Sequence, residues 1–518
     1  MAGFNKLIKQ RPKKVLNKEM AKAYKPSRKL ELVLRAATTL GKADKFYESA
    51  LESDRAYREL IRDVTRHDPE FVMKTAFYVR NVMGLRTPAT VMIAECARTL
   101  SVDGIDTKDV FETPVSDYVS ASIKRVDDMT ELVAYCLKAS GKEKTYTGRT
   151  PLAIQRGLKK AFGKFDEYQF AKYDKEDVLV TPKDVMCISH PVPESYDQEI
   201  LYRKIGNESL AVPETWEQYI MIHGSTKKNW SYILDKMGYL GILRNLRNLI
   251  IHDVDTDDIV GRIADPERAR KSRVFPFQFY SAYRALDNFR DDTRDFRETI
   301  GRVQAALSRA LTTSAESAIP EFVGRTAIFC DNSGSMTRSI HPKSNITFRE
   351  IANLYGIILA NRSDEPFLYL YGTNVLEIRG RNEVVGEEFT TDILRTMSEM
   401  ERIAYNGKVG GNTHTYKCFD ELTRDEIAVD RAVFFTDEQG YGKDTVMTAL
   451  QKYRTGVRVN PYVFSFDIAH YGTTQFPESD RRTAVIGGWT DSTLNFIHLY
   501  ETEGDKIVKI IENLSITR

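Results

Sequence analysis

The sequence predicts a two-part protein, in which an all-α array of helical repeats is followed by an α/β domain with a doubly wound sheet. Three observations predict it. The 518 residues exceed what one hydrophobic core usually organises. Apolar residues recur at helical spacing up to about residue 317. After about residue 318, short apolar runs typical of buried strands alternate with helical segments.

The first part contains helical segments of roughly 10–20 residues separated by Gly and Pro. Examples are residues 30–40, 70–82, 88–100 and 230–250, and no stretch shows convincing strand alternation. About 300 residues of short helices are too many for a simple bundle and fit stacked helix pairs of the solenoid type. The breakers between residues 176 and 226 predict a long, partly irregular surface excursion.

Charge is distributed unevenly along the chain. Residues 1–30 hold ten Lys or Arg and one acid, so we expect a basic amino-terminal arm over residues 1–29 that leads into the helical domain at 30–317. Lys and Arg outnumber Asp and Glu by 53 to 45 in residues 1–317, whereas residues 318–518 have 22 against 28. An anionic partner would therefore meet the first part.

The second part begins with a predicted buried strand at residues 326–330. Strands and helices then alternate, which predicts a sheet whose ligands gather at the carboxyl ends of its strands. The expected later strands are 367–371, 431–435 and 462–466, and the expected helices are 348–362, 391–403, 416–423, 442–453, 491–501 and 505–514.

Short oxygen-bearing side chains follow the first of these strands directly, as Asp331, Ser333 and Ser335. Mg²⁺ binds about six hard oxygens and usually only one or two carboxylates, which suits such a loop. Two further loops supply candidates, residues 410–415 and the segment that contains Asp437. The sequence therefore predicts a divalent-cation site, most simply for Mg²⁺.

This loop arrangement resembles the metal-ion-dependent adhesion site of the von Willebrand factor A family, across residues 318–518. The resemblance implies that Ser333 and Ser335 bind the ion directly, that Thr413 binds directly or through water, and that Asp331 and Asp437 bind largely through water. The family's Gly-Gly-Thr appears here as Gly-Gly-Asn-Thr, so Thr415 is a rival of Thr413. A site that keeps the fold without the ion is the alternative.

Six stretches of the first part resemble the TROVE module of the Ro ribonucleoprotein family. They are residues 77–88, 157–162, 168–173, 188–191, 237–248 and 277–286. With the second domain, the resemblance spans the whole chain. It implies a closed ring of HEAT-type repeats that binds Y-type small noncoding RNA on its outer surface and takes single-stranded 3′ ends of misfolded RNA into a central hole. It also implies an associated exoribonuclease as a partner.

Cations at helical spacing, interleaved with aromatic residues, form the main predicted RNA-binding face: Arg156, Lys159, Lys160, Lys164 and Lys172. Phosphates attract such cations, and unstacked bases stack on aromatic rings. The aromatic residues Phe162, Phe165, Tyr168 and Tyr173 have core packing as their alternative role.

Seven further residues are candidates. His190 matches a histidine that the family uses to contact Y-type RNA, although the lysine that often follows it is absent here. Arg86, Arg244 and Arg247 lie in matching motifs but could equally serve helix-to-helix hydrogen bonding. Arg270, Lys271 and Arg273 form a basic run that we expect in a loop, either lining the ring or solvated.

These features predict a non-catalytic RNA-binding scaffold of RNA quality control. The alternative is a metal-dependent adhesion module that accepts an acidic residue from a partner and has no RNA role. A nuclease is disfavoured because the metal loops are rich in hydroxyls and poor in carboxylates. The chain begins with no signal-peptide pattern and has five scattered cysteines, so we expect a cytoplasmic monomer without a disulfide framework or a membrane role.

Overall fold

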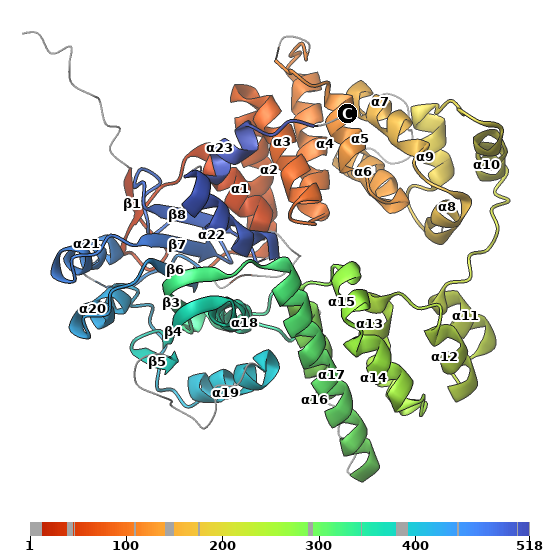
Figure 1. Ribbon diagram of the computed structural model, residues 1–518. Helices are drawn as coiled ribbons and strands as arrows, with labels where there is room; N and C mark the ends of the chain where they lie inside the picture. Colours follow the sequence, from red (N-terminus) through yellow and green to blue (C-terminus); the bar gives the residue numbers. More distant parts are fainter. Residues whose placement is uncertain are drawn as a thin grey trace, which may run out of the picture. The chain divides into compact units, whose positions relative to one another are not determined.

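The computed structural model describes residues 13–38, 45, 47–107, 110–139, 150–174, 177–287, 294–342, 344–379, 392–442, 445–489, 491–504 and 506–516. The chain divides into two compact units (Figure 1). The α/β unit comprises Met1–Ser53 and Ala315–Ile507, and the helical unit comprises Asp54–Ser314 and Val508–Arg518. No helix in the described residues is long and apolar enough to cross a membrane.

The helical unit consists of helices joined by turns and loops, as the periodicity predicts, and α17 with 25 residues is the longest in the described residues. Its elements are α2 (Ala50–His67), α3 (Pro69–Asn81), α4 (Thr87–Val102), α5 (Val115–Ser122), α6 (Val126–Ala139), α7 (Leu152–Phe162), α8 (Glu167–Tyr173), α9 (Pro182–Ser189), α10 (Tyr196–Gly206), α11 (Trp216–His223), α12 (Lys227–Leu234), α13 (Tyr239–Ile251), α14 (Thr256–Ala264), α15 (Pro266–Ser272), α16 (Pro276–Asp287), α17 (Arg294–Ala318) and α23 (Ile507–Glu512).

Helix α3 shows how the local sequence sets these elements. Its N-cap residue Asp68 accepts a hydrogen bond from the Phe71 amide at 3.0 Å, and Pro69 occupies the first turn, where no amide donor is needed. Phe71, Val72 and Met73 are almost completely buried.

Two stretches of the helical unit differ from the expected segments. The expected single segment 230–250 is two helices, α12 and α13. The predicted irregular excursion contains α9, α10 and α11.

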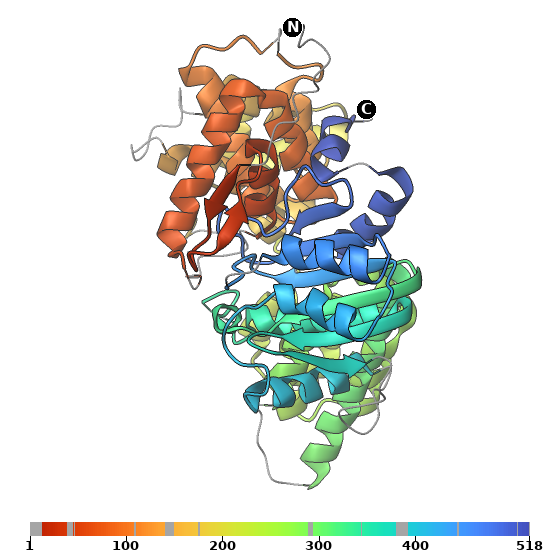
Figure 2. The same cartoon turned by 90° about the vertical axis from the view of Figure 1, so that its left-hand side faces the viewer.

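The α/β unit has a six-stranded sheet in the order β5-β4-β3-β6-β7-β8, in which only β5 is antiparallel to its neighbour (Figure 2). The doubly wound α/β prediction is confirmed, whereas β5 and β8 were not predicted. The strands are β3 (Phe322–Asp331), β4 (Ser363–Tyr371), β5 (Val375–Arg379), β6 (Arg431–Thr436), β7 (Tyr462–Asp467) and β8 (Thr483–Gly487); the helices are α18 (Phe348–Asn361), α19 (Ile393–Tyr405), α20 (Tyr416–Arg424), α21 (Val446–Gly456) and α22 (Asp491–Glu503).

The amino-terminal segment belongs to the α/β unit, which differs from the expected division into an arm at 1–29 and a helical domain from 30. A hairpin of β1 (Lys14–Leu16) and β2 (Lys22–Tyr24) precedes α1 (Arg28–Thr38). Tyr24 exchanges backbone hydrogen bonds with Thr474 at 2.8 and 2.9 Å. Helix α1 packs so closely on β8 that a Cβ atom at Gly487 would lie 2.8 Å from the Cα of Leu34. Residues 1–12 of the predicted arm lie outside the described residues.

The end of the chain belongs to the helical unit, although we expected residues 318–518 to form one domain. From Val508 onward the chain groups with the helices. Lys74 of α3 donates a hydrogen bond from Nζ to the carbonyl of Glu512 at 2.7 Å. Each unit is therefore built from two separate pieces of the chain.

Candidate metal site and basic helical face

Three loops of the α/β unit converge at the carboxyl ends of β3 and β6, as predicted. The amide of Gly334 donates to the carbonyl of Gly411 at 2.8 Å, which joins the first loop to the second. The amide of Tyr441 donates to the carbonyl of Thr413 at 2.6 Å, which joins the third loop to the second. Within the first loop, the hydroxyl oxygens of Ser333 and Ser335 lie 3.3 Å apart.

The carboxylate of Asp331 is fully buried and held by neighbouring donors. Its Oδ1 accepts from the Ser333 amide at 2.9 Å, and its Oδ2 accepts from the Thr436 hydroxyl at 2.7 Å. Burial raises the pKa of Asp331 even though these hydrogen bonds favour the charged form.

Asp437 is the second fully buried carboxylate of the site, and only one of its two oxygens has a hydrogen-bond partner. Its Oδ1 accepts from the Gln439 amide at 3.0 Å, whereas its Oδ2 has no hydrogen-bond partner. Burial, followed by the charge of Asp331, raises the pKa of Asp437 to about 8. A cation between the loops would stabilise the charged form of both buried carboxyl groups, because burial raises the pKa of each.

The residues present fit a hard divalent cation. The buried hydroxyl of Thr415 also lacks a hydrogen-bond partner, so two unpartnered oxygens come from two of the loops. Ser333, Ser335 and Thr413 are buried beside them. The described residues contain no cluster of three His, Cys, Asp or Glu suited to a metal. A cation at the three loops would therefore be bound largely by hydroxyl oxygens. Binding of Mg²⁺ at this site stays a prediction.

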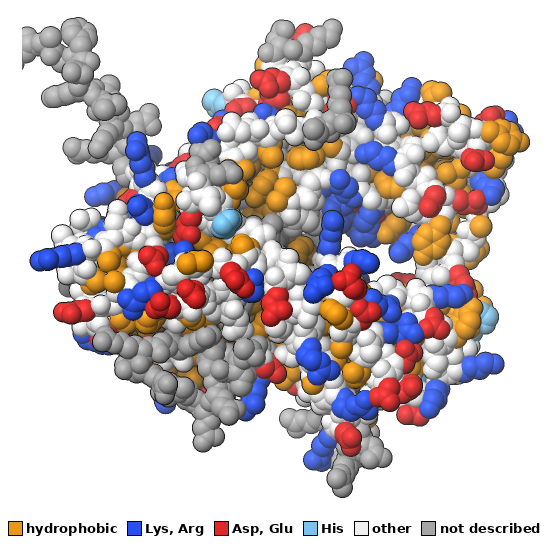
Figure 3. All heavy atoms as spheres, in the orientation of Figure 1, with side chains coloured by type: hydrophobic (Ala, Val, Ile, Leu, Met, Phe, Trp, Pro, Cys, Tyr) orange, Lys and Arg blue, Asp and Glu red, His pale blue; other side chains and the backbone are white. Residues whose placement is uncertain are grey.

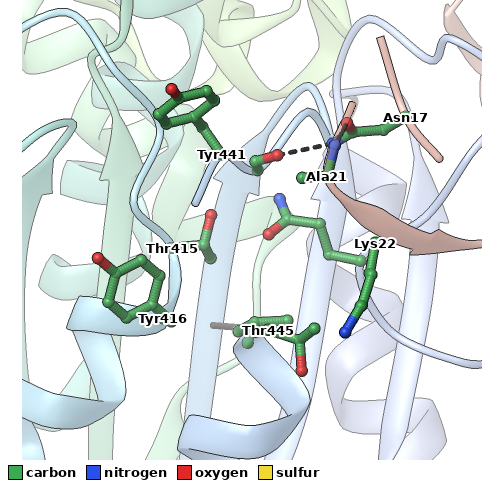
Figure 4. Close-up of a pocket in the computed structure, with 10 residues that line it drawn as sticks. Asn17, Ala21, Lys22, Thr415, Tyr416, Tyr441 and Thr445 are labelled. Carbon is green, nitrogen blue, oxygen red and sulfur yellow. Dashed lines mark hydrogen bonds between the residues drawn. The ribbon is translucent and has the colours of Figure 1, made fainter. Parts of the chain in front are cut away.

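The amino-terminal hairpin covers part of this edge of the sheet and forms a small cavity with the loops (Figure 4). The cavity volume is about 20 Å³, enough for one water molecule. The Nδ2 of Asn17 donates to the carbonyl of Gly440 at 2.7 Å across it. Lining residues of the cavity also include Ala21, Lys22, Thr415, Tyr416, Tyr441, Thr445 and Gln475.

All five cations of the predicted face on α7 and α8 are exposed. Figure 3 shows Lys and Arg side chains, interspersed with apolar ones, over this region of the helical unit. Lys160 pairs with Asp117, and Lys164 donates to the carbonyl of Ser120 at 2.6 Å. Arg156 and Lys159 form no ion pair with any described residue, so their charges are available to a ligand.

The aromatic residues of this segment divide into two groups. Phe162 and Phe165 are buried and pack against Phe170 with ring centroids 4.8 and 6.0 Å away, so they belong to the core. Tyr168 is 51% exposed and remains able to stack on a base. The guanidinium of Arg125 lies 5.0 Å from the ring centre of Tyr173.

Arg86 lies at the N-cap of α4 in an internal ion-pair network. It reaches Asp127 at 3.0 Å and Asp128 at 2.7 Å, and Arg80 binds the same Asp128 at 2.7 Å. Burial alone would raise the pKa of Asp128, but Arg80 and Arg86 together outweigh it and lower that pKa. This network favours the structural reading of Arg86.

The remaining candidates are exposed and lie on three other elements. His190 terminates α9 in the left-handed conformation, with φ 47°. Arg244 and Arg247 share α13. The basic run expected in a loop is instead helix α15, which Asp265 caps by accepting from the amides of Glu267 and Arg268. Arg270 and Lys271 both face Glu267, and Arg273 follows the helix.

A TROVE domain matches residues 17–208 and 204–323 of this sequence, more than half of the chain. The chain belongs to the TROVE domain family. The described basic face on α7 and α8 lies inside the first matched stretch.

This TROVE protein is similar to one solved structure and to two curated proteins. The crystal structure of the Deinococcus radiodurans RO (RSR) protein has the same fold, with a TM-score of 0.60 at 14% identity, covering 92% of this chain and 100% of the other. Telomerase protein component 1 of Rattus norvegicus is 22% identical over 310 residues, and that of Mus musculus is 21% identical. The aligned region is 44% of this chain but only 11% of either curated relative.

Sequence reasoning missed the amino-terminal residues beside the metal loops. Asn17, Glu19 and Tyr47 have no motif and reach the loops only through the fold. The one available signal was that two short apolar pairs, Val15-Leu16 and Ala23-Tyr24, each follow a lysine in this basic stretch.

Proposed function

We propose that this TROVE protein is a non-catalytic RNA-binding scaffold of noncoding RNA quality control. It binds Y-type small noncoding RNA on an outer surface and takes single-stranded 3′ ends of misfolded RNA into a central hole. The observation that carries the proposal is the exposed cationic face of α7 and α8 inside the matched TROVE stretch.

The chemistry of this face supports RNA over an apolar ligand. Arg156, Lys159 and Lys160 lie on α7, Lys164 follows that helix and Lys172 lies on α8. Neutralising phosphates with such cations releases counterions whatever the base sequence. Tyr168 adds one exposed ring at which an unpaired base could stack. Such a surface suits RNAs of mixed sequence, which is what a quality-control protein must accept.

The test is binding of the full chain to a structured RNA with a single-stranded 3′ tail, measured by fluorescence anisotropy over a salt series. About five phosphate contacts predict a slope of about −3.5 in a plot of log K against log salt for single strands. The same structured RNA without its 3′ tail can bind only the outer surface, so comparing the two RNAs distinguishes binding there from binding in the central hole. A salt-independent or undetectable interaction would exclude the RNA-binding proposal.

The absence of catalysis is part of the proposal and has its own experiment. We expect a labelled RNA to stay intact when it is incubated with Mg²⁺ and protein freed of exoribonuclease. An exoribonuclease is instead the expected associated partner of a cytoplasmic monomer. Cleavage that persists through purification and is lost in Asp331→Ala would make the protein a nuclease.

A second candidate function is metal-dependent adhesion through the α/β unit. The unpartnered Oδ2 of Asp437 and the converging hydroxyls support it, because they suit an ion whose remaining position accepts an Asp or Glu from another protein. Mg²⁺ held by Ser333, Ser335 and Thr413, with Asp331 and Asp437 behind water, would supply that position. Pull-downs with and without chelator test it, and Asp331→Ala must lose the same partners that chelation removes.

A further inference from the structure

The amino-terminal hairpin is anchored on the third metal loop, immediately after Asp437. The backbone amide of Lys18 donates to Gln439 Oε1 at 2.9 Å, and the side chain of Asn17 donates to the Gly440 carbonyl at 2.7 Å. These contacts join positions more than 420 residues apart in the chain. The hairpin therefore stands at the edge of the sheet where the candidate metal site lies.

The turn of this hairpin has a fixed conformation. The Oδ1 of Asn17 accepts hydrogen bonds from the amides of Glu19 at 3.0 Å and Ala21 at 2.9 Å. Met20 takes the left-handed conformation, with φ 57°. These bonds fix the backbone at Glu19, and the hydrogen bond from the Tyr47 hydroxyl orients its carboxylate.

Tyr47 connects that carboxylate to the metal loops. Its hydroxyl donates to Glu19 Oε1, lies beside the hydroxyl of Ser335 and is close to the carboxylate of Asp437. The ring is held edge-on against Tyr471, with centroids 5.2 Å apart. Glu19, Tyr47 and Ser335 thus form a continuous polar path from the hairpin to the first loop.

We propose that Glu19 is an intramolecular acidic partner of the candidate metal ion, held over the loops by Tyr47, so that the chain's own hairpin takes the place that another protein's Asp or Glu would fill. This inference rests on the proposed metal site. It also gives a role to the carboxylate that the hairpin carries to the edge of the sheet where Asp331 and Asp437 are buried, the latter with an unpartnered oxygen. Such an arrangement is unfavourable without a cation and favourable with one.

The test is Mn²⁺ titration calorimetry of the full chain and three variants. Glu19→Gln keeps the shape but removes the charge, and we expect Mn²⁺ affinity to fall about tenfold, as for loss of one outer ligand. Tyr47→Phe should give a smaller loss. Glu478→Gln is the matched control, because Glu478 accepts from the amide and hydroxyl of Ser27 at 2.9 and 3.0 Å and so holds the same segment away from the loops. Its affinity should equal that of the wild type.

Hydrogen exchange supplies a second readout that does not depend on the affinity itself. Saturating Mn²⁺ should slow exchange of the Lys18 amide in the wild type but not in Glu19→Gln. Equal Mn²⁺ affinity and equal protection in these two proteins, with binding abolished in Asp331→Ala, would overturn the role of Glu19 and leave the metal site standing. Wild-type protein that binds no more Mn²⁺ than Asp331→Ala would overturn the metal site and this inference together.

Discussion

Removing the two unpaired cations of α7 should weaken RNA binding far more than removing a paired one. Arg156 and Lys159 are exposed and form no ion pair with a described residue, whereas Lys160 already pairs with Asp117. Each free cation that meets a single-stranded phosphate contributes about 0.7 to the salt slope, which at 0.15 M salt corresponds to about fourfold in affinity. The double variant Arg156→Gln/Lys159→Gln should therefore lose about 15-fold.

Anisotropy with the tailed RNA over a salt series measures both consequences. The slope of log K against log salt should become shallower by about 1.4 in the double variant. The matched control Lys160→Gln should change affinity by about twofold or less, since its ammonium group must leave Asp117 before it binds a phosphate. An unchanged slope in the double variant, or an equal loss in the control, would refute the assignment of this face.

Three further predictions concern stability and the metal site. Asp128→Ala should cost about 3–5 kcal/mol in urea unfolding, because it leaves the buried Arg80 without its partner and removes one partner of Arg86. An unchanged midpoint would return Arg86 to the RNA-binding candidates. Gly356→Ala should cost about 1–3 kcal/mol, because the new Cβ would lie 2.2 Å from Cys330 Sγ, and a stable variant would contradict this packing. Calorimetric Mg²⁺ affinity should fall as pH drops below about 8, where Asp437 binds a proton that the ion must displace; a flat profile would exclude that competition.

The fold was predictable where the pattern is local. The run 326–330 and its polar loop define β3 and the first metal loop without any other information. Strands β5 and β8 were missed because each lies at an edge of the sheet and pairs with only one neighbour. The hairpin was missed because its strands have three residues each and are stabilised by a partner near residue 474.

The candidate site shows the same limit. The three metal loops follow from strand order, since parallel strands bring their carboxyl ends together. Which candidate side chains have a structural role could not be predicted from the sequence, because that depends on partners far away in the chain. Arg86 donates a hydrogen bond to Asp128, which lies 42 positions away in the sequence. Phe162 is buried because its ring packs against Phe170 and Tyr202.

The division of each unit into two chain segments has a consequence for how the protein is made. During synthesis, the hairpin and α1 emerge more than 400 residues before the segments on which they pack. The entire helical unit up to Ser314 intervenes. A fragment that starts at residue 318 would leave the face of β8 without α1 and would expose the apolar surface beneath Leu34. The hairpin and α1 must therefore wait without their partners until β8 and the loop at residue 474 have been made.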